Sequence, residues 1–86
     1  MPPKRGTVVC IKAGREKGKF MAVLSCDGFT AVVCDGKERP LERPKTKNVK
    51  HVALTCFELT DEQMKTNRSI RHALNDFKAN NVKGEI

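Results

Sequence analysis

Residues Gly6 to Gly36 have the sequence GTVVCIKAGREKGKFMAVLSCDGFTAVVCDG, and their pattern carries most of the information about the fold. This stretch holds three apolar runs, at 6–13, 19–26 and 29–34, and a glycine or an Asp-Gly pair follows each run. Apolar runs of this length between turn residues predict β-strands, and Asp-Gly between such runs predicts tight hairpins. The first half of the chain is therefore predicted to be β.

Two further strands are predicted before residue 56. A short charged strand is expected over 37–42, where Pro40 confines it to a sheet edge. Pro44 and the four residues after it predict a loop, and 49–54, VKHVAL, predicts a fifth strand. Short strands joined by tight turns favour a small barrel, because closing a sheet hides its edges. Apolar residues on both faces of the second and third strands are typical of strongly bent strands around a small core.

The second half of the chain has the hydrophobic period of a helix. Thr60 and Gln63 have the spacing of a capping box, which predicts a helix over about 60–79. Three residues are expected to end it: Asn80, Asn81 and Gly84. Its apolar stripe consists of Ile70, Ala73, Leu74 and Phe77. We expect this stripe to pack on the barrel, with binding to a partner as the alternative.

The length of 86 residues predicts one domain with a small core and little room for a large cofactor. We divide it into a barrel with a short N-terminal arm, 1–56, and a helical segment of the same domain, 57–86. No apolar run approaches the roughly 20 residues of a membrane span. The N-terminus lacks the apolar region of a signal peptide. We therefore expect a soluble, cytoplasmic protein with no membrane partner.

Positive charge is concentrated in the first half. The chain has 17 Lys and Arg residues against 10 Asp and Glu residues, a net charge of +7. Residues 1–50 hold 12 of the basic and 5 of the acidic side chains, whereas the second half is balanced. This asymmetry indicates a polyanionic partner for the basic half. Solubility alone is the alternative, because small domains often carry such a net charge.

The four cysteines do not have the spacing of a zinc site. Structural zinc sites bring their ligands in close pairs such as C-x-x-C, and no such pair occurs here. Each cysteine lies within or next to an apolar run: Cys10, Cys26, Cys34 and Cys56. We expect free thiols that pack as small hydrophobic groups, and we predict neither a metal nor another cofactor.

The segment GREKGK, from Gly14 to Lys19, joins the first two predicted strands. It is not a phosphate loop of the Walker type, because three residues separate its glycines instead of four and Phe20 stands in place of Ser or Thr. A tight turn in which Gly18 takes a positive φ is the structural interpretation. Such a turn would also present three cations to phosphate groups: Arg15, Lys17 and Lys19.

These residues resemble the KOW motif. The resemblance rests on Gly6-x-Val8-x-Cys10-Ile11, Gly14-x-x-Lys17-Gly18 and Met21-Ala22-Val23-Leu24, in which Gly18 matches the hallmark glycine of the motif. KOW modules are SH3-like β-barrels of ribosomal proteins and transcription elongation factors, and they can also bind proteins.

A closer likeness is carried by Lys12-Ala13-Gly14-Arg15-x-Lys17-Gly18 and Pro44-Lys45-x-Lys47. These phrases are similar to short bacterial KOW-domain proteins described as RNA-binding, which resemble KOW-containing large-subunit ribosomal proteins of archaea and eukaryotes. The resemblance covers roughly residues 6–52. It implies that RNA meets the loop of Gly14 and Gly18 and the basic residues near it.

A second basic cluster lies within twelve positions: Arg39, Arg43, Lys45, Lys47 and Lys50. Pro40 and Pro44 favour an extended path, and an extended basic segment can follow a phosphate backbone and release counterions. A solvated loop is the alternative interpretation. Three more cations would extend the surface: Lys4, Arg5 and Lys12.

Aromatic side chains are few, with four phenylalanines and neither Trp nor Tyr. Modules that read unpaired bases use exposed aromatic side chains as stacking platforms. Phe20 and Phe29 lie in predicted strands and Phe77 lies on the helical stripe, so we expect all three in the core. We therefore predict recognition of folded RNA by its shape and backbone.

The sequence shows no constellation of catalytic residues. His51 and His72 have no recognisable nucleophile or metal-ligand partner. Residues and resemblance together predict a non-enzymatic protein that binds structured RNA, ribosomal RNA before others, with large-subunit ribosomal proteins as further partners and no small-molecule substrate. The alternative is a KOW adaptor that binds proteins in transcription or translation.

Overall fold

The computed structural model describes residues 3–82. Within this range, five antiparallel strands form one sheet in the order β4-β3-β2-β1-β5, and a helix follows them. The strands are β1 (Thr7–Ile11), β2 (Phe20–Cys26), β3 (Thr30–Cys34), β4 (Lys45–Asn48) and β5 (Val52–Glu58). The helical segments are the 3₁₀ turn η1 (Val49–His51), α1 (Asn67–Phe77) and the π-helical η2 (Lys78–Val82). The prediction of a mainly β fold with one C-terminal helix is confirmed.

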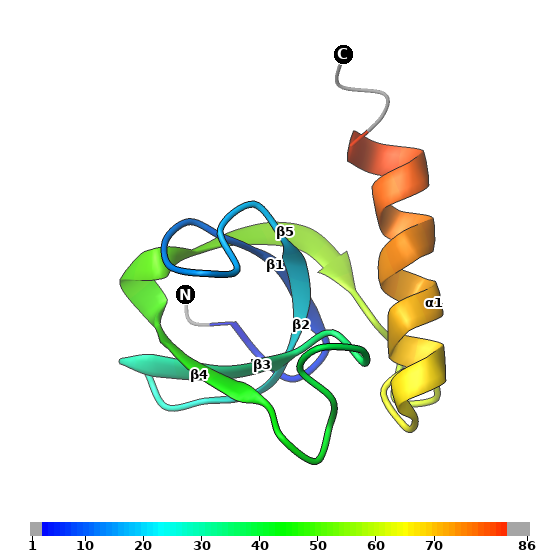
Figure 1. The fold of residues 1–86 in the computed structure, drawn as a ribbon, viewed down its shortest axis with the longest axis horizontal. Helices are drawn as coiled ribbons and strands as arrows, with labels where there is room; N and C mark the ends of the chain where they lie inside the picture. The colour runs from blue at the N-terminus through cyan, green and yellow to red at the C-terminus, as the bar shows by residue number, and fades with distance from the viewer. Residues whose placement is uncertain (1–2, 83–86) are drawn as a thin grey trace.

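The sheet is strongly curled, as Figure 1 shows. Pairing of β1 with β5 shifts its register between Thr7 and Val9, and pairing of β2 with β3 shifts between Val23 and Ser25. A bulge of this kind bends a strand and increases its twist. The curl gives the sheet a barrel-like shape in which η1 joins the edge strands β4 and β5.

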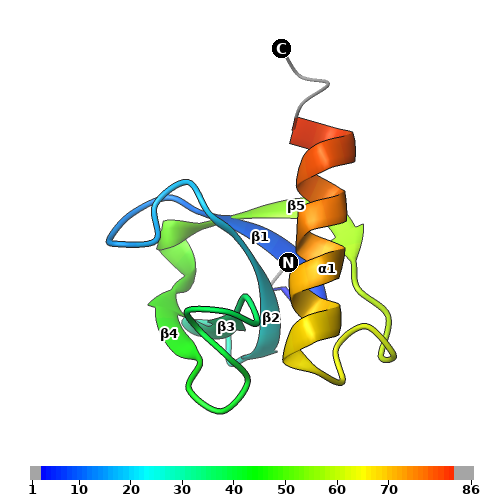
Figure 2. The same cartoon turned by 45° about the vertical axis from the view of Figure 1, so that its right-hand side comes forward.

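Each face of the curled sheet has its own apolar cluster. Side chains alternate along a strand, so Val9 faces the inside of the curl and Val8 faces α1. The inner cluster consists of Val9, Ile11, Met21, Val23, Ala31, Val33 and Val52. The outer cluster consists of Val8, Ala22, Cys34, Met64, Ile70, Leu74 and Phe77. Both faces of the strands are apolar because α1 covers the outer face (Figure 2), and not only because the strands bend.

The apolar stripe predicted for the helix is confirmed, because all four of its residues are buried. The helix nevertheless begins later than predicted. Thr60 and Gln63 do exchange hydrogen bonds, at 2.9 and 3.1 Å, but they cap an isolated turn. A second capping box follows, between Thr66 and Ser69, and it starts α1 at Asn67. Two consecutive boxes thus divide a segment that the sequence pattern treats as one helix.

The fourth strand also lies later than predicted. Residues 37–42 form turns, because Asp35 Oδ1 accepts hydrogen bonds at 2.9 Å from the backbone N–H groups of Lys37 and Arg39. Such local bonds compete with strand pairing. The segment KTKN after Pro44, which the sequence predicts as a loop, forms β4 and pairs with β3 along its whole length.

The fifth strand and the end of the helix also differ from their predicted bounds. The fifth strand begins at Val52 rather than at residue 49, because Asn48 Oδ1 accepts from Lys50 N at 2.9 Å and starts η1. It ends at Glu58 rather than at residue 54. At the other end of the chain, η2 continues through the asparagines predicted to end the helix, and Gly84 lies outside the described residues. No helix within residues 3–82 is both long and apolar enough to cross a membrane.

Candidate nucleic-acid interface

A buried acid lies in the middle of the predicted basic loop. The side chain of Glu16 is 7% exposed and lies between two cations from other segments. Arg39 donates to Glu16 Oε2 from Nε at 3.0 Å and from Nη2 at 2.8 Å, and Lys47 Nζ lies 2.9 Å from Oε1. Lys47 and then Arg39 lower the pKa of Glu16 from 4.5 to about 2. One carboxylate therefore fastens the loop between β1 and β2 to the turn before β4 and to β4 itself.

The loop between β1 and β2 is a compact turn that requires glycine at two positions. Gly14 and Gly18 have φ values of +90° and +88°, which side chains disfavour. Gly18 N donates to Ile11 O at 2.8 Å and closes the turn. A Cβ atom at position 14 would lie 2.9 Å from Lys47 Nζ, so Gly14 also leaves room for the partner of Glu16.

Four exposed cations lie on this loop and next to it, and we call them the basic rim: Lys12, Arg15, Lys17 and Lys50. Lys12 N donates to His51 O at 2.7 Å, which brings η1, the turn that contains Lys50, beside the loop. Figures 1 and 2 show the turn between β4 and β5 next to the loop between β1 and β2. Within the described residues, none of these four side chains forms an ion pair. The basic rim therefore presents uncompensated positive charge on one side of the fold.

Four of the cations predicted to meet RNA are engaged in ion pairs. Lys4 Nζ lies 3.4 Å from Glu58 Oε2, and the other three are close to the loop between β1 and β2. Arg39 and Lys47 hold Glu16, and the side chain of Lys47 is only 10% exposed. Lys19 pairs with Glu38, and this hydrogen bond raises the pKa of Lys19. The structure thus gives Arg39, Lys47 and Lys19 a role in shaping the loop.

Three other predicted residues lie away from the basic rim. Arg5 precedes β1 whereas the rim follows it, so the length of β1, about 17 Å, separates them. Arg43 lies in the turn before β4, and Leu41 N ties that turn to α1 by donating to Asn67 Oδ1 at 2.7 Å. Lys45 is half-buried at the start of β4, the opposite end from η1.

The prediction that Phe29 lies in the core is wrong. This residue is 79% exposed, because β3 begins only at Thr30 and Phe29 belongs to the turn before it. Phe20 and Phe77 are packed as predicted, with ring centroids 4.9 Å apart in an edge-to-face contact. The β2–β3 turn thus carries an exposed aromatic side chain that the sequence pattern assigns to a strand.

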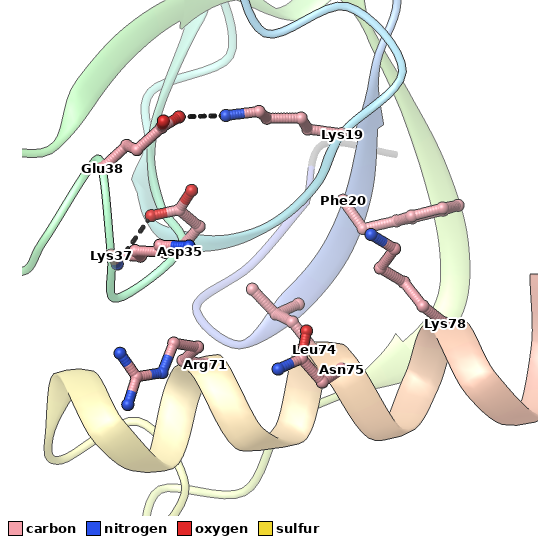
Figure 3. A pocket seen from close by; sticks show the side chains of 9 residues that line it. All are labelled: Lys19, Phe20, Asp35, Lys37, Glu38, Arg71, Leu74, Asn75 and Lys78. Atoms are coloured by element: carbon pink, nitrogen blue, oxygen red, sulfur yellow. Dashed lines mark hydrogen bonds and ion pairs between the residues drawn. The ribbon is translucent and has the colours of Figure 1, made fainter.

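A groove of about 250 Å³ lies between α1 and the sheet, and Figure 3 shows its lining. Lysines and Arg71 line it together with the acids Asp35 and Glu38. Lys19 and Glu38 form an ion pair across it. Because its charges are of both signs, this groove is less favourable for a polyanion than the basic rim.

The cysteines are free thiols in different surroundings. Cys34 is buried, Cys10 and Cys26 are half-buried, and Cys56 is exposed, so the expected apolar packing does not extend to Cys56. Burial raises the pKa of the Cys34 thiol to about 11. Residues 3–82 contain no group of three or more His, Cys, Asp or Glu side chains that could hold a metal ion.

Neither protein-family models nor curated proteins give a match to this chain.

Proposed function

We propose that this chain is a non-enzymatic RNA-binding protein of the KOW type, with an SH3-like barrel, and that it binds structured ribosomal RNA in the cytoplasm. The observation that carries the proposal is the basic rim, a set of exposed cations on a loop whose shape the buried Glu16 fixes. Uncompensated charge grouped on one face is the electrostatic signature of nucleic-acid binding.

In this structure the cations that hold the loop in shape are different from those that remain exposed and can bind phosphates. Arg39 and Lys47 neutralise Glu16 behind the loop, so this acid does not cancel the charge of the exposed side chains. A loop held in one conformation loses little entropy when it binds. The cations of the basic rim then displace counterions from the phosphates, which gives affinity without reading the bases.

The KOW assignment is supported by the position of the motif in the fold. The loop with Gly14 and Gly18 joins the first two strands, as the motif requires, and Gly18 has the positive φ expected of its glycine. Five antiparallel strands with a 3₁₀ turn before the last of them, within residues 3–82, are consistent with an SH3-like barrel. Large-subunit ribosomal proteins are the further partners proposed on this resemblance.

The proposal is tested by removing the charge of the basic rim. The variant K12A/R15A/K17A/K50A and the wild-type chain are each titrated against a fluorescently labelled hairpin of ribosomal RNA, with fluorescence anisotropy as the readout. At roughly 0.5 kcal/mol for each ion pair removed, we expect at least about tenfold weaker binding. The slope of log K against log salt should become shallower by about 0.7–0.9 for each phosphate that the variant no longer neutralises.

A charge-matched control removes four exposed cations from the helical segment: K65A/R68A/R71A/K78A. It should retain most of the affinity. Equal weakening of both variants would mean that net charge alone drives binding, and no weakening of the rim variant would refute the assignment.

Sedimentation of the native protein through sucrose gradients tests the ribosomal target. Co-migration with large subunits that ribonuclease or high salt abolishes would support it. Protein that stays at the top under all conditions would instead favour a protein adaptor.

A further inference from the structure

We propose that Phe29 is a stacking platform for an unpaired base of the RNA held by the basic rim. This inference rests on the proposed function and names its substrate class more closely: RNA in which a base is free to leave the helix next to a phosphate backbone. It revises the prediction that recognition depends on shape and backbone alone.

The first observation is that the core does not use this ring. Phe29 is 79% exposed, and it belongs to neither of the apolar clusters of the described residues. The rings of Phe20 and Phe57 each pack against Phe77. A stacking platform needs a free aromatic face, and Phe29 offers one.

The second observation is that the backbone of Phe29 is held on both sides. Asp27 Oδ1 accepts from Phe29 N at 2.9 Å and from Thr30 N at 2.8 Å. On the other side, Phe29 O accepts from Val49 N at 2.9 Å. The turn that carries the ring is therefore fixed before any ligand arrives, so a stacked base would not have to order it.

The third observation is the position of Phe29 relative to the basic rim. Val49, which holds Phe29, begins η1, and Lys50 is the next residue. His51, the last residue of η1, accepts the hydrogen bond from Lys12 N. Consecutive backbone contacts thus lead from the exposed ring across η1 to the exposed cations.

An exposed ring next to exposed cations suits an unpaired nucleotide better than a nucleotide within a duplex. Every base has a face that can stack on an aromatic ring, and the phosphates of the same strand are bound best by cations nearby. Asp27 carries negative charge on one side of Phe29, and Lys50 lies on the other, so the phosphate backbone would run from the ring toward η1. A fully paired helix keeps its bases stacked internally and would gain nothing from the ring.

The test titrates the wild-type chain with two RNA hairpins that share the same compact tetraloop, in which the loop bases stack on one another. The stem of one hairpin carries a single-nucleotide bulge, and the stem of the other is fully paired. We expect F29A to weaken binding to the bulged hairpin about 5- to 150-fold, the range for loss of one base–aromatic stack. Binding to the paired hairpin should not change. With 2-aminopurine in the bulge, the wild-type chain should change its fluorescence and F29A should not.

Two further variants separate stacking from other contacts. F29Y keeps an aromatic face and should retain binding to the bulged hairpin, whereas F29L keeps only apolar volume and should behave like F29A. Full binding by F29L would overturn the stacking proposal in favour of an apolar contact, such as one with a protein. If F29A binds the bulged hairpin as the wild type does, the inference fails but RNA binding stands. If the wild type binds neither hairpin, both fail.

Discussion

The substitution E16Q tests the claim that one buried carboxylate organises the loop between β1 and β2. Glutamine has nearly the same shape, but it removes the negative charge that Arg39 and Lys47 share. The pKa of Glu16 is lowered from 4.5 to about 2, and at about 1.4 kcal/mol per tenfold change this corresponds to roughly 3 kcal/mol. The amide oxygen of glutamine still accepts hydrogen bonds from Arg39 and Lys47, so we expect a smaller loss of about 1–2 kcal/mol. For a domain of this size that lowers the melting temperature by about 4–15 °C.

The contribution of Glu16 to the free energy of unfolding depends on pH, and the direction of this dependence follows from its pKa. The pKa of Glu16 is lower in the folded protein than in the unfolded chain, so its contribution is fully present above about pH 4.5 and is lost as the pH falls toward 2. E16Q should therefore be less stable than the wild type at pH 7, and the difference should shrink between pH 4.5 and 2. Other acids whose pKa values are lowered, such as Asp27 and Glu38, remain in both proteins.

Urea unfolding followed by far-UV circular dichroism measures both effects, since the chain has no Trp or Tyr for intrinsic fluorescence. E62Q is the matched control, because Glu62 is an exposed acid in an ion pair of 3.2 Å with Lys65. It should change the free energy of unfolding by less than about 0.5 kcal/mol. If E16Q and the wild type differ by the same amount at pH 7 and pH 2.5, the proposed role of the Glu16 charge is refuted.

Two further substitutions and one chemical modification test other parts of the fold. G36A should lower stability by about 2–3 kcal/mol in thermal melts, because Gly36 has a φ of +78° and a Cβ there would clash with the backbone oxygen of Asn67; a neutral result would mean that the turn does not contact α1. T66A should cost about 1 kcal/mol through loss of the cap of α1, measured by urea unfolding. Under native conditions a thiol reagent should modify Cys56 quickly and Cys34 only on unfolding, as peptide mass spectrometry would show; rapid modification of Cys34 would contradict its burial.

The strands that could be predicted are those in which the local pattern and the fold agree. Apolar runs bounded by glycine place β1, β2 and β3 within one residue or two of their observed limits. β4 could not be predicted in the same way, because KTKN has no apolar alternation and forms a strand only by completing the open edge of β3. Its hydrogen bonding to β3 makes this segment a strand, and such a long-range pairing cannot be predicted from the local sequence pattern.

The candidate site shows the same limit. Composition indicates that the loop is basic, yet it cannot show that Glu16 takes two cations from segments more than 20 residues away. A lone acid within a basic loop was the available signal. The exposure of Phe29 had a signal too, since the residue directly follows an Asp-Gly turn, where the strand has not yet begun.

The presence of apolar side chains on both faces of the sheet has a consequence for synthesis of the protein. The outer face, with Val8, Ala22 and Cys34, is covered mainly by residues from Met64 onward. The ribosome makes all five strands of the described range before it makes α1, and at about 5–20 residues per second the roughly 20 residues that follow β5 take about 1–4 s. During that interval the nascent sheet has an apolar outer face without this cover. The outer face is therefore covered only after α1 has been made, and until then its exposed apolar side chains favour association between nascent chains.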